Sequence, residues 1–517
     1  MAYLMGIDVG TTGAKTILIS ETGKVVCSLL EEYPLYTPRP NRAEQNPEDW
    51  WNATVKSIKG VLGKSGIKGE EIKGVGLSGQ MHGAVLIDKN YKVLRPCILW
   101  CDQRTAKQCE YITRTIGRDR LIQVACNPAL TGFTAGKVIW VRDNEPKIYE
   151  KIFKILLPKD YIRFMLTGSF ATEVSDASGT LFLDVKERRW SNEILEKLDI
   201  DRNLLPECYE STVISGEISP NVSHQTGLKT GTPVVGGAGD QASQAVGSGI
   251  IKEGRIGSTI GTSGVVFAFS NEVKVDPSGR VHTFCHAVPK KWHIMGVMLS
   301  AGGSLRWFRD NLGSQEIREA KAKDVDPYEV LTREASTVEA GCEGLVFLPY
   351  LTGERTPYAD PDARGVFFGL TLRHKKPHLI RSIMEGVSYG LRDSLKIIKE
   401  MRVPVEEVRA SGGGARSSLW RQIQADVNGL ELVTVNITEG AAFGASLLSG
   451  VGAGVYDNIE EACEETIRIT SRVLPRKENV KRYNEYYKIY RSLYPILKNS
   501  FSKVSKVVKG DKDENKM

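Results

Sequence analysis

Hydrophobic and polar positions near the start of the chain form two apolar runs separated by a short polar turn. Residues 4–9 are apolar except for one carboxylate, Asp8, and a second apolar run begins at Ala14. The residues between them are Gly10-Thr11-Thr12-Gly13. This pattern predicts a strand, a tight turn and a returning strand.

The turn of this predicted hairpin suits an anion. Glycines let backbone N–H groups approach a phosphate closely, threonine hydroxyls add donors, and a neighbouring carboxylate such as Asp8 can hold a hydrated magnesium ion. An ordinary hairpin with a solvated aspartate fits the same short stretch, because short motifs also match by accident.

The same pattern recurs in the second half of the chain. Residues 256–270 again show an apolar strand, the turn Gly261-Thr262-Ser263-Gly264 and another apolar strand. The two turns start at residues 10 and 261, 251 residues apart in a chain of 517. A repeat of this length predicts two similar domains, each offering a phosphate-binding hairpin to a cleft between them.

Two further strand ends present polar side chains. The predicted strand 72–77 ends in a loop at 78–83 that carries Gln80, Met81 and His82, which suits contact with a small polar ligand, although a lone histidine also fits a structural role. The predicted strand 95–100 precedes Asp102, which is interpreted as a helix cap or a substrate contact.

A second carboxylate follows a glycine cluster. Val234 and Val235 form a buried strand, residues 236–239 are Gly-Gly-Ala-Gly, and Asp240 comes directly before the small-residue helix 242–249. The glycines bring the backbone close to a ligand or to another segment, and Asp240 is either a functional carboxylate or a helix cap.

The remaining patterns complete the chain. We predict a strand at 25–30, a helix from Asn46 with Trp51 and Ile58 in the core, a polar loop at 175–179, and glycine-lined turns at 302–303 and 411–417. The region 459–497 is predicted to be helical and residues 502–517 to be a charged, disordered tail.

Composition sets the broad class. A chain of 517 residues is too long for one core, and we expect domains at 1–250 and 251–498 followed by a tail at 499–517. The hydrophobic content of 41% and charged content of 25% are those of a soluble globular protein without a membrane span. The net charge of +7 is partly in the tail, so we expect no nucleic-acid partner. Nine scattered cysteines without a CxxC pair predict reduced thiols in a cytoplasm.

Together these features indicate phosphoryl transfer from a nucleoside triphosphate. That reaction needs positioned phosphates, a magnesium ion and a base that takes the proton from the attacking hydroxyl. Asp8 fits the metal and Asp240 fits the base. The chain has no GxxxxGK[ST] motif, which excludes a P-loop enzyme.

The chain resembles the FGGY family of carbohydrate kinases from about residue 3 to about residue 495. Both family signatures are present, GFTAGKVIWVRDN at 132–144 and GVFFGLTLRHKKPHLIRSIME at 365–385. The resemblance implies an α/β fold of two ribonuclease H-like (actin-like ATPase) domains with an ATP cleft between them, and family precedent suggests a homodimer. It also implies that Mg²⁺ is bound with Asp8 and Asp240.

Within the family, residues 78–83 and 94–105 resemble the members that act on a ketopentose. This implies ATP-dependent phosphorylation of the 5-hydroxyl of D-xylulose, with Asp240 as the base. Met81, His82, Asp240, Gln241 and Asp102 are the expected sugar-binding residues. The expected nucleotide-binding residues are Thr11, Thr12, Gly13, Gly261, Thr262, Gly303, Gly413, Gly414 and Ser417.

Two positions depart from the common family pattern. Cys101 and Gln241 stand where many members carry asparagine, which leaves the preferred sugar open. The alternatives are a kinase for ribulose, gluconate, glycerol or another polyol, and a non-catalytic actin-like ATP switch. The loop at 78–83 and the glycine-flanked Asp240 favour the enzyme.

Overall fold

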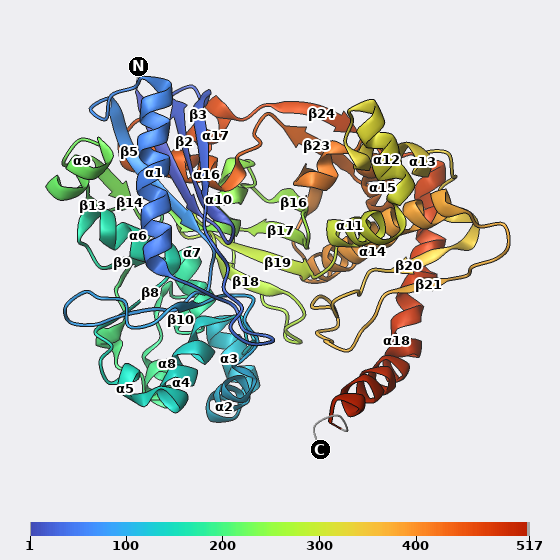
Figure 1. The fold of residues 1–517 in the computed structure, drawn as a ribbon, viewed down its shortest axis with the longest axis horizontal. Coiled ribbons are helices and arrows are strands. Elements are labelled where there is room, and N and C mark those ends of the chain that lie inside the picture. Colours follow the sequence, from blue (N-terminus) through green and yellow to red (C-terminus); the bar gives the residue numbers. More distant parts are fainter. Residues whose placement is uncertain (1, 514–517) are drawn as a thin grey trace. The chain divides into compact units, whose positions relative to one another are not determined.

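The computed structural model describes residues 2–513 (Figure 1), which form two compact units. The first unit contains residues 1–252, 269–293 and 437–468, and the second contains 253–268, 294–436 and 469–517. The units are therefore interleaved along the chain, whereas the predicted domains follow chain order. The α/β fold class that the sequence predicted is confirmed, while the predicted cleft between the domains stays a prediction.

The first unit is built on a mixed sheet with the strand order β13-β14-β5-β1-β2-β3, and β15 also pairs with β5. The predicted hairpin is present, because β1 and β2 pair antiparallel with Asp8 opposite Lys15. Both β1 and β15 run parallel to β5, so the carboxyl ends of these three strands meet at one edge. The strands are β1 (Tyr3–Val9), β2 (Gly13–Ser20), β3 (Val25–Glu32), β5 (Ile72–Gly79), β13 (Ile214–Glu217), β14 (Pro233–Val235) and β15 (Ala238–Gly239).

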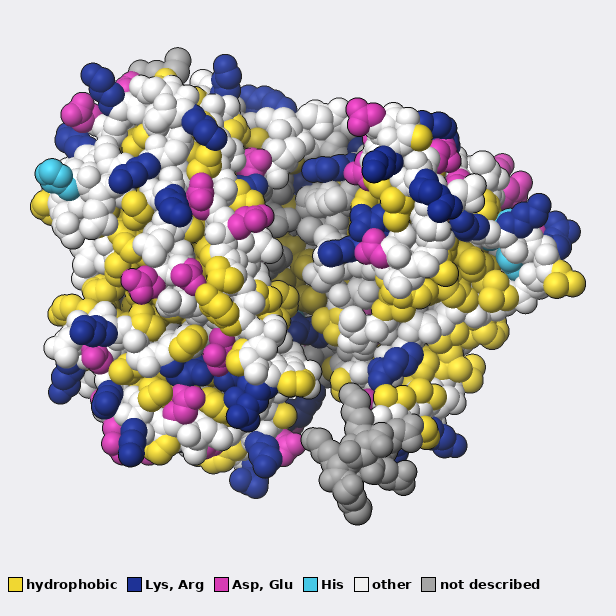
Figure 2. Space-filling model, viewed as in Figure 1, with side chains coloured by type: hydrophobic (Ala, Val, Ile, Leu, Met, Phe, Trp, Pro, Cys, Tyr) yellow, Lys and Arg dark blue, Asp and Glu magenta, His cyan; other side chains and the backbone are white. Residues whose placement is uncertain are grey.

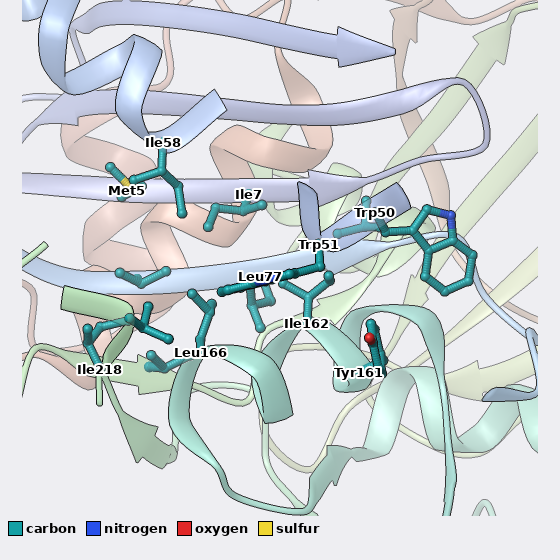
Figure 3. Close-up of a cluster of buried hydrophobic side chains, with 14 of the residues drawn as sticks. Met5, Ile7, Trp50, Trp51, Ile58, Leu77, Tyr161, Ile162, Leu166 and Ile218 are labelled. Carbon is teal, nitrogen blue, oxygen red and sulfur yellow. The ribbon is translucent and has the colours of Figure 1, made fainter. Parts of the chain in front are cut away.

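Helix α1 (Pro47–Ser65) begins where the sequence predicts, because the Asn46 side chain accepts a hydrogen bond from the N–H of Glu48. Its first turn carries the acidic residues Glu48 and Asp49, and its exposed lysines follow further along the helix. The visible face of the first unit shows scattered basic and acidic side chains (Figure 2). The inward side of α1 packs on the sheet with Trp51 and Ile58 buried, together with Ile162 and Leu166 of α6 (Pro158–Thr167) (Figure 3). This core positions the strand ends that carry the site.

Helix α16 (Gly440–Gly452) packs on the other face of the same sheet, although it lies more than 400 residues after β1 in the chain. Glycines make this contact possible. A Cβ at Gly6 would lie 1.9 Å from the carbonyl oxygen of Ala442, and one at Gly76 would lie 1.8 Å from that of Ala445. The same helix contacts α10 (Asp240–Gly247), which follows β15.

The second unit repeats the hairpin on a sheet that contains the strand order β19-β17-β16-β22-β23-β24. Strands β16 and β17 pair antiparallel and β22 runs parallel to β16, as β5 does to β1 in the first unit. The strands are β16 (Gly254–Ile260), β17 (Gly264–Ser270), β19 (Trp292–Met298), β22 (Val405–Ser411), β23 (Glu431–Val435) and β24 (Ile469–Val473). The helices are α11 (Gly302–Leu312), α12 (Ser314–Lys323), α13 (Pro327–Ala335), α14 (Lys376–Glu400), α15 (Ser418–Asn428) and α18 (Lys477–Asp513).

Three local predictions are wrong. Residues 175–179 are not a loop but form α7 (Val174–Ala177) and a 3₁₀ turn, because the Glu173 side chain accepts from the N–H groups of Ser175 and Asp176. The helical region 459–497 is interrupted by β24, which pairs with β23. The tail is helical as far as Asp513. Contacts with the rest of the unit hold it, because Phe501 is buried and Ser505 accepts a hydrogen bond from Arg364. Residues 514–517 of the predicted tail lie outside the described residues.

Two expectations from composition hold within the described chain. None of its helices is long and apolar enough to cross a membrane. All nine cysteines are free thiols, as the absence of a CxxC pair predicted.

Candidate active site

Asp8 and Asp240 lie at the edge where the parallel strands of the first unit end. Asp8 is in register with Ser78 of β5, and Ser78 is in register with Ala238 of β15, two residues before Asp240. The Ser78 hydroxyl donates to Asp8 Oδ1 at 2.9 Å. The structure therefore brings together the two carboxylates that the sequence singled out.

The charge of Asp8 contributes to the protonation behaviour of Asp240. Burial, and then the charge of Asp8, raise the pKa of Asp240 to about 7, although hydrogen bonds from Gln241 oppose the shift. Burial also raises the pKa of Asp8, opposed by Ser78 and by the charge of Lys15. A carboxyl group with a pKa near neutrality is suited to accept a proton from a hydroxyl.

These carboxylates also fit a magnesium ion. Mg²⁺ takes oxygen ligands, keeps several waters and is commonly held by one or two carboxylates together with substrate phosphates. The negative charge of Asp8 disfavours ionisation of Asp240. A divalent cation bound by these carboxylates would offset that repulsion. No group of three or more potential metal-binding side chains occurs among the described residues, so the fit is to such a solvated ion.

The raised pKa of Asp240 makes stability depend on pH. Between the ordinary value of 3.8 and about 7, the folded state holds a proton that the unfolded state has lost, so its contribution to stability declines as the pH rises through this window. We expect the stability difference between Asp240→Asn and the wild type to shift in favour of the variant as the pH rises towards about 7, and to stay at its largest value above that pH. Unfolding midpoints of both proteins in a chelator, from about pH 5 to about pH 8, check this; a constant difference would contradict it.

The loop at 78–83 adjoins Asp240. A Cβ on Gly239 would lie 2.9 Å from Met81 Cγ, so the buried Met81 packs directly against the residue before Asp240. The next residue, His82, has a left-handed backbone (φ 70°) and its ring packs edge-on against Phe133, with 4.8 Å between ring centroids.

The orientation of His82 follows from its hydrogen bonds. Nδ1 lies 2.7 Å from the carbonyl oxygen of Gly179, which can only accept, so Nδ1 is the donor in this contact. The His82 carbonyl oxygen accepts from Lys137 Nζ at 2.6 Å and from the Thr134 hydroxyl at 3.1 Å, both in the first family signature. That signature therefore helps to position the loop.

A fully buried charge cluster, which the sequence analysis missed, lies beneath this edge. Lys159 Nζ is 2.7 Å from Asp160 Oδ1 and 3.4 Å from both Glu173 Oε1 and Asp176 Oδ2. The cluster connects to the site because Ser175, which donates to Glu173, accepts from the N–H of Gly239 at 3.1 Å. The only sequence signal is the density of charges at 159–163 within apolar surroundings.

Breaking this cluster should destabilise the protein. Lys159→Met keeps the aliphatic stem but removes the cation that Glu173 and Asp176 share, while Asp160 keeps its pairing with the buried Arg163, and the loss costs about 3–5 kcal/mol of unfolding free energy. Chemical denaturation measures the loss, and Lys56→Met on the exposed side of α1 is the matched control. Equal stability of both variants would show that the buried carboxylates are protonated, or that the cluster makes no net contribution to stability.

Asp102 does not cap a helix, contrary to one of its two interpretations. Helix α2 (Ala106–Ile116) begins after Thr105, and Asp102 is fully buried before it. Its carboxylate accepts from the N–H of Ala43 at 2.7 Å and pairs with the Arg104 guanidinium at 2.7 Å. These partners occupy both oxygens, which favours a structural role over sugar contact.

The first hairpin turn is held by the protein itself. The Thr11 hydroxyl donates to Gln80 Oε1 at 3.2 Å and accepts from the Trp100 indole at 3.0 Å. A Cβ on Gly13 would lie 2.6 Å from the Glu31 carbonyl oxygen, so this glycine is needed for packing on β3. Thr12 alone is exposed at the turn.

The six nucleotide-binding residues predicted in the second half all line one pocket of the second unit, of about 810 Å³. They are Gly261, Thr262, Gly303, Gly413, Gly414 and Ser417. The glycines let three segments meet: a Cβ on Gly303 would lie 2.9 Å from the Thr262 carbonyl oxygen, and one on Gly414 would lie 2.6 Å from Ile260 Cβ. The pocket's size is within the usual range for a small-molecule site.

One wall of this pocket was not predicted. It consists of Asp326, Tyr328, Glu329, Thr332 and Arg333, at and within α13. In the sequence this stretch is an ordinary amphipathic helix after an Asp-Pro start, so no local signal distinguishes it from a solvated surface helix.

The fold and the site define a class of protein, and comparison with known proteins agrees. The chain belongs to the FGGY family of carbohydrate kinases: the family's N-terminal domain matches residues 3–247 and its C-terminal domain matches residues 257–453. The gap between the matches, residues 248–256, reaches into the first strand of the second hairpin.

Individual relatives are similar over nearly their whole length. A xylulose kinase from Bacillus subtilis (strain 168) is 38% identical over 96% of this chain and 98% of its own. A gluconokinase from the same strain is 35% identical over 98% and 99%. The crystal structure of a "xyloylose kinase" from Brucella ovis matches with a TM-score of 0.88 and 35% identity over 96% and 99%.

Proposed function

We propose that this protein transfers a phosphoryl group from ATP to the 5-hydroxyl of D-xylulose. The observation that carries the proposal is the contact of Met81 with Gly239, which puts the loop expected to bind sugar beside the carboxylate expected to act as base. The similarity to xylulose kinases supports the choice of sugar.

In the proposed mechanism the sugar hydroxyl donates its proton to Asp240 as its oxygen attacks the γ-phosphorus of ATP, the bond from that phosphorus to the bridging oxygen breaks, and ADP leaves. The elevated pKa of Asp240 matches this task, because a base near neutrality combines ionisation with proton affinity. His82 accepts from a sugar hydroxyl and Met81 forms an apolar wall. Mg²⁺ held at Asp8 would neutralise phosphate charge.

The pocket of the second unit is the proposed site for ATP. Its lining includes the hydroxyl-bearing residues Thr262 and Ser417, which suit phosphate oxygens, and Tyr328 offers an aromatic face. Among the predicted nucleotide residues in the first unit, Thr12 stays a proposed contact because it is exposed, whereas the engaged hydroxyl of Thr11 favours a role in shaping the turn.

An assay of ADP release with a panel of sugars tests the function. D-xylulose should give the highest kcat/KM, ahead of D-ribulose and well ahead of gluconate and glycerol. If the kcat/KM for gluconate or glycerol equalled that for D-xylulose, the assignment of D-xylulose as substrate would be wrong, and the membership of the FGGY family would be unaffected. If no acceptor stimulated ADP release, the alternative of a non-catalytic switch would gain support.

Sugar discrimination should depend on His82. We expect His82→Ala to lower kcat/KM for D-xylulose by a factor equivalent to about 1–3 kcal/mol of transition-state stabilisation. The reason is that the variant leaves a buried sugar hydroxyl without its partner. The KM for ATP should change little. His224→Ala, an exposed histidine of the same unit, is the control. Equal effects on the kinetic parameters for sugar and for ATP would indicate that the loop at 78–83 belongs to the phosphate site.

Residence in the cytoplasm and assembly as a homodimer complete the proposal. The nine free thiols favour a reducing compartment.

A further inference from the structure

A second cavity of about 670 Å³ lies in the second unit, and the proposed kinase function does not use it. It lies between helices α14 and α18, and none of its lining residues lines the nucleotide pocket. We call it the basic groove. Its lining consists of Arg392, Leu395, Lys396, Lys399, Asn428, Leu430, Asn484, Glu485, Tyr487, Lys488 and Arg491.

The charges of the basic groove are strongly one-sided. Five of the lining side chains are cationic and one, Glu485, is anionic. The polar residues have the same spacing on each helix: 392, 396 and 399 on α14, and 484, 488 and 491 on α18. Residues separated by four and three positions lie on one face of a helix, so both helices present these side chains to the groove.

The cations at the base of the groove are positioned by the protein. Arg392 Nη2 donates to Asn484 Oδ1 at 2.6 Å, which joins the two helices, and its guanidinium lies 4.2 Å from the centre of the Tyr487 ring. The Tyr487 hydroxyl donates to Asp393 at 2.6 Å. These contacts preorganise Arg392 without giving it a carboxylate partner within hydrogen-bonding distance.

The remaining cations are only partly compensated. Glu485 pairs with Lys488 at 2.7 Å, and Arg491 Nε lies 3.5 Å from Asp393 Oδ1. Lys396 and Lys399 form no salt bridge within the described part of the chain. Burial, and then the charge of Arg392, lower the pKa of Lys399, so these two cations repel each other. Burial also lowers the pKa of Arg392, and the nearby charge of Asp393 opposes that shift.

We propose that the basic groove binds a small molecule that carries two or more phosphate groups. Five cations around one cavity, of which Lys396 and Lys399 form no salt bridge among the described residues, favour a ligand with several negative charges. Phosphate oxygens match both the planar donors of arginine and the ammonium groups of lysine. The volume accommodates a sugar bisphosphate or pyrophosphate. Because the nucleotide pocket shares no residue with the groove, the proposal does not rest on the proposed kinase activity.

Calorimetric titration of the full chain in a phosphate-free buffer tests the proposal with three probes: inorganic phosphate, pyrophosphate and fructose 1,6-bisphosphate. We expect pyrophosphate and the bisphosphate to bind at least about tenfold more tightly than inorganic phosphate, and more weakly as salt is added. Binding should also raise the thermal unfolding midpoint, since a ligand of the folded state stabilises it.

Variants locate the site. The double variant Lys396→Gln/Lys399→Gln removes two charges that have no ion-pair partner, so the fold should be retained, and we expect pyrophosphate affinity to fall at least about tenfold. The matched control is Lys56→Gln/Lys59→Gln, which removes two lysines from the exposed side of α1 and should bind as the wild type does.

Three results would overturn the proposal. Unchanged pyrophosphate affinity in the groove variant would place the site elsewhere. If sodium chloride of equal ionic strength raised the unfolding midpoint by the same amount, the shift would be explained by general charge screening and not by binding. Tighter binding of a single-stranded oligonucleotide that displaces pyrophosphate would make the groove a nucleic-acid surface.

Discussion

Asp240→Asn should lower turnover with D-xylulose by about a hundred- to ten-thousand-fold, equivalent to about 3–5 kcal/mol of activation free energy. The amide keeps the shape of the side chain and its place at the start of α10, but it cannot accept the proton of the attacking hydroxyl. Initial rates of ADP release, with sugar and nucleotide both saturating, measure the loss.

Binding measurements separate this loss from a folding defect. The affinities of Asp240→Asn for sugar and ATP should stay close to those of the wild type, and Asp119→Asn in the exposed first turn of α3 (Arg118–Ala125) should leave turnover unchanged. If Asp240→Asn kept more than about a tenth of wild-type turnover, the residue would be better explained as a structural carboxylate that accepts hydrogen bonds from Gln241 at the start of α10.

The second large effect is expected at Asp8. In Asp8→Ala the Ser78 hydroxyl loses its acceptor and the edge of the sheet loses one of two facing carboxylates. We expect low turnover and at least about a tenfold rise in the magnesium concentration for half-maximal rate, because the remaining carboxylate holds the ion less well.

A magnesium titration at fixed ATP and sugar checks this result, with Asp119→Asn again as the control. An unchanged titration would mean that Asp8 is an ordinary polar residue of the hairpin. A variant that loses turnover but keeps the wild-type magnesium dependence would place Asp8 in phosphate or sugar positioning.

Local sequence patterns predicted the parts of the fold that depend on neighbouring residues. The two hairpins, the start of α1 at Asn46 and the strand before Asp240 are determined by glycine turns, a capping side chain and short apolar runs. The glycines at 303, 413 and 414 were predictable as ligand-lining because only close backbone approach explains them, and the structure places all three around one pocket.

Features that depend on distant residues were not predictable. The buried state of Lys159 results from carboxylates that arrive from another segment, including Glu173, and nothing within helix α6 indicates it. The wall formed by α13 is a site only because the second hairpin packs nearby. The structural role of Asp102 likewise depends on Ala43, 59 residues earlier.

The packing of α16 on β1 has a consequence for how the chain folds during its synthesis. Gly6 and Gly76 meet Ala442 and Ala445, so the first sheet cannot complete its second face until the ribosome has made almost the whole protein. We infer that the N-terminal half waits in a partly folded form that exposes apolar surface, and that nascent chains ending before residue 437 depend on chaperones.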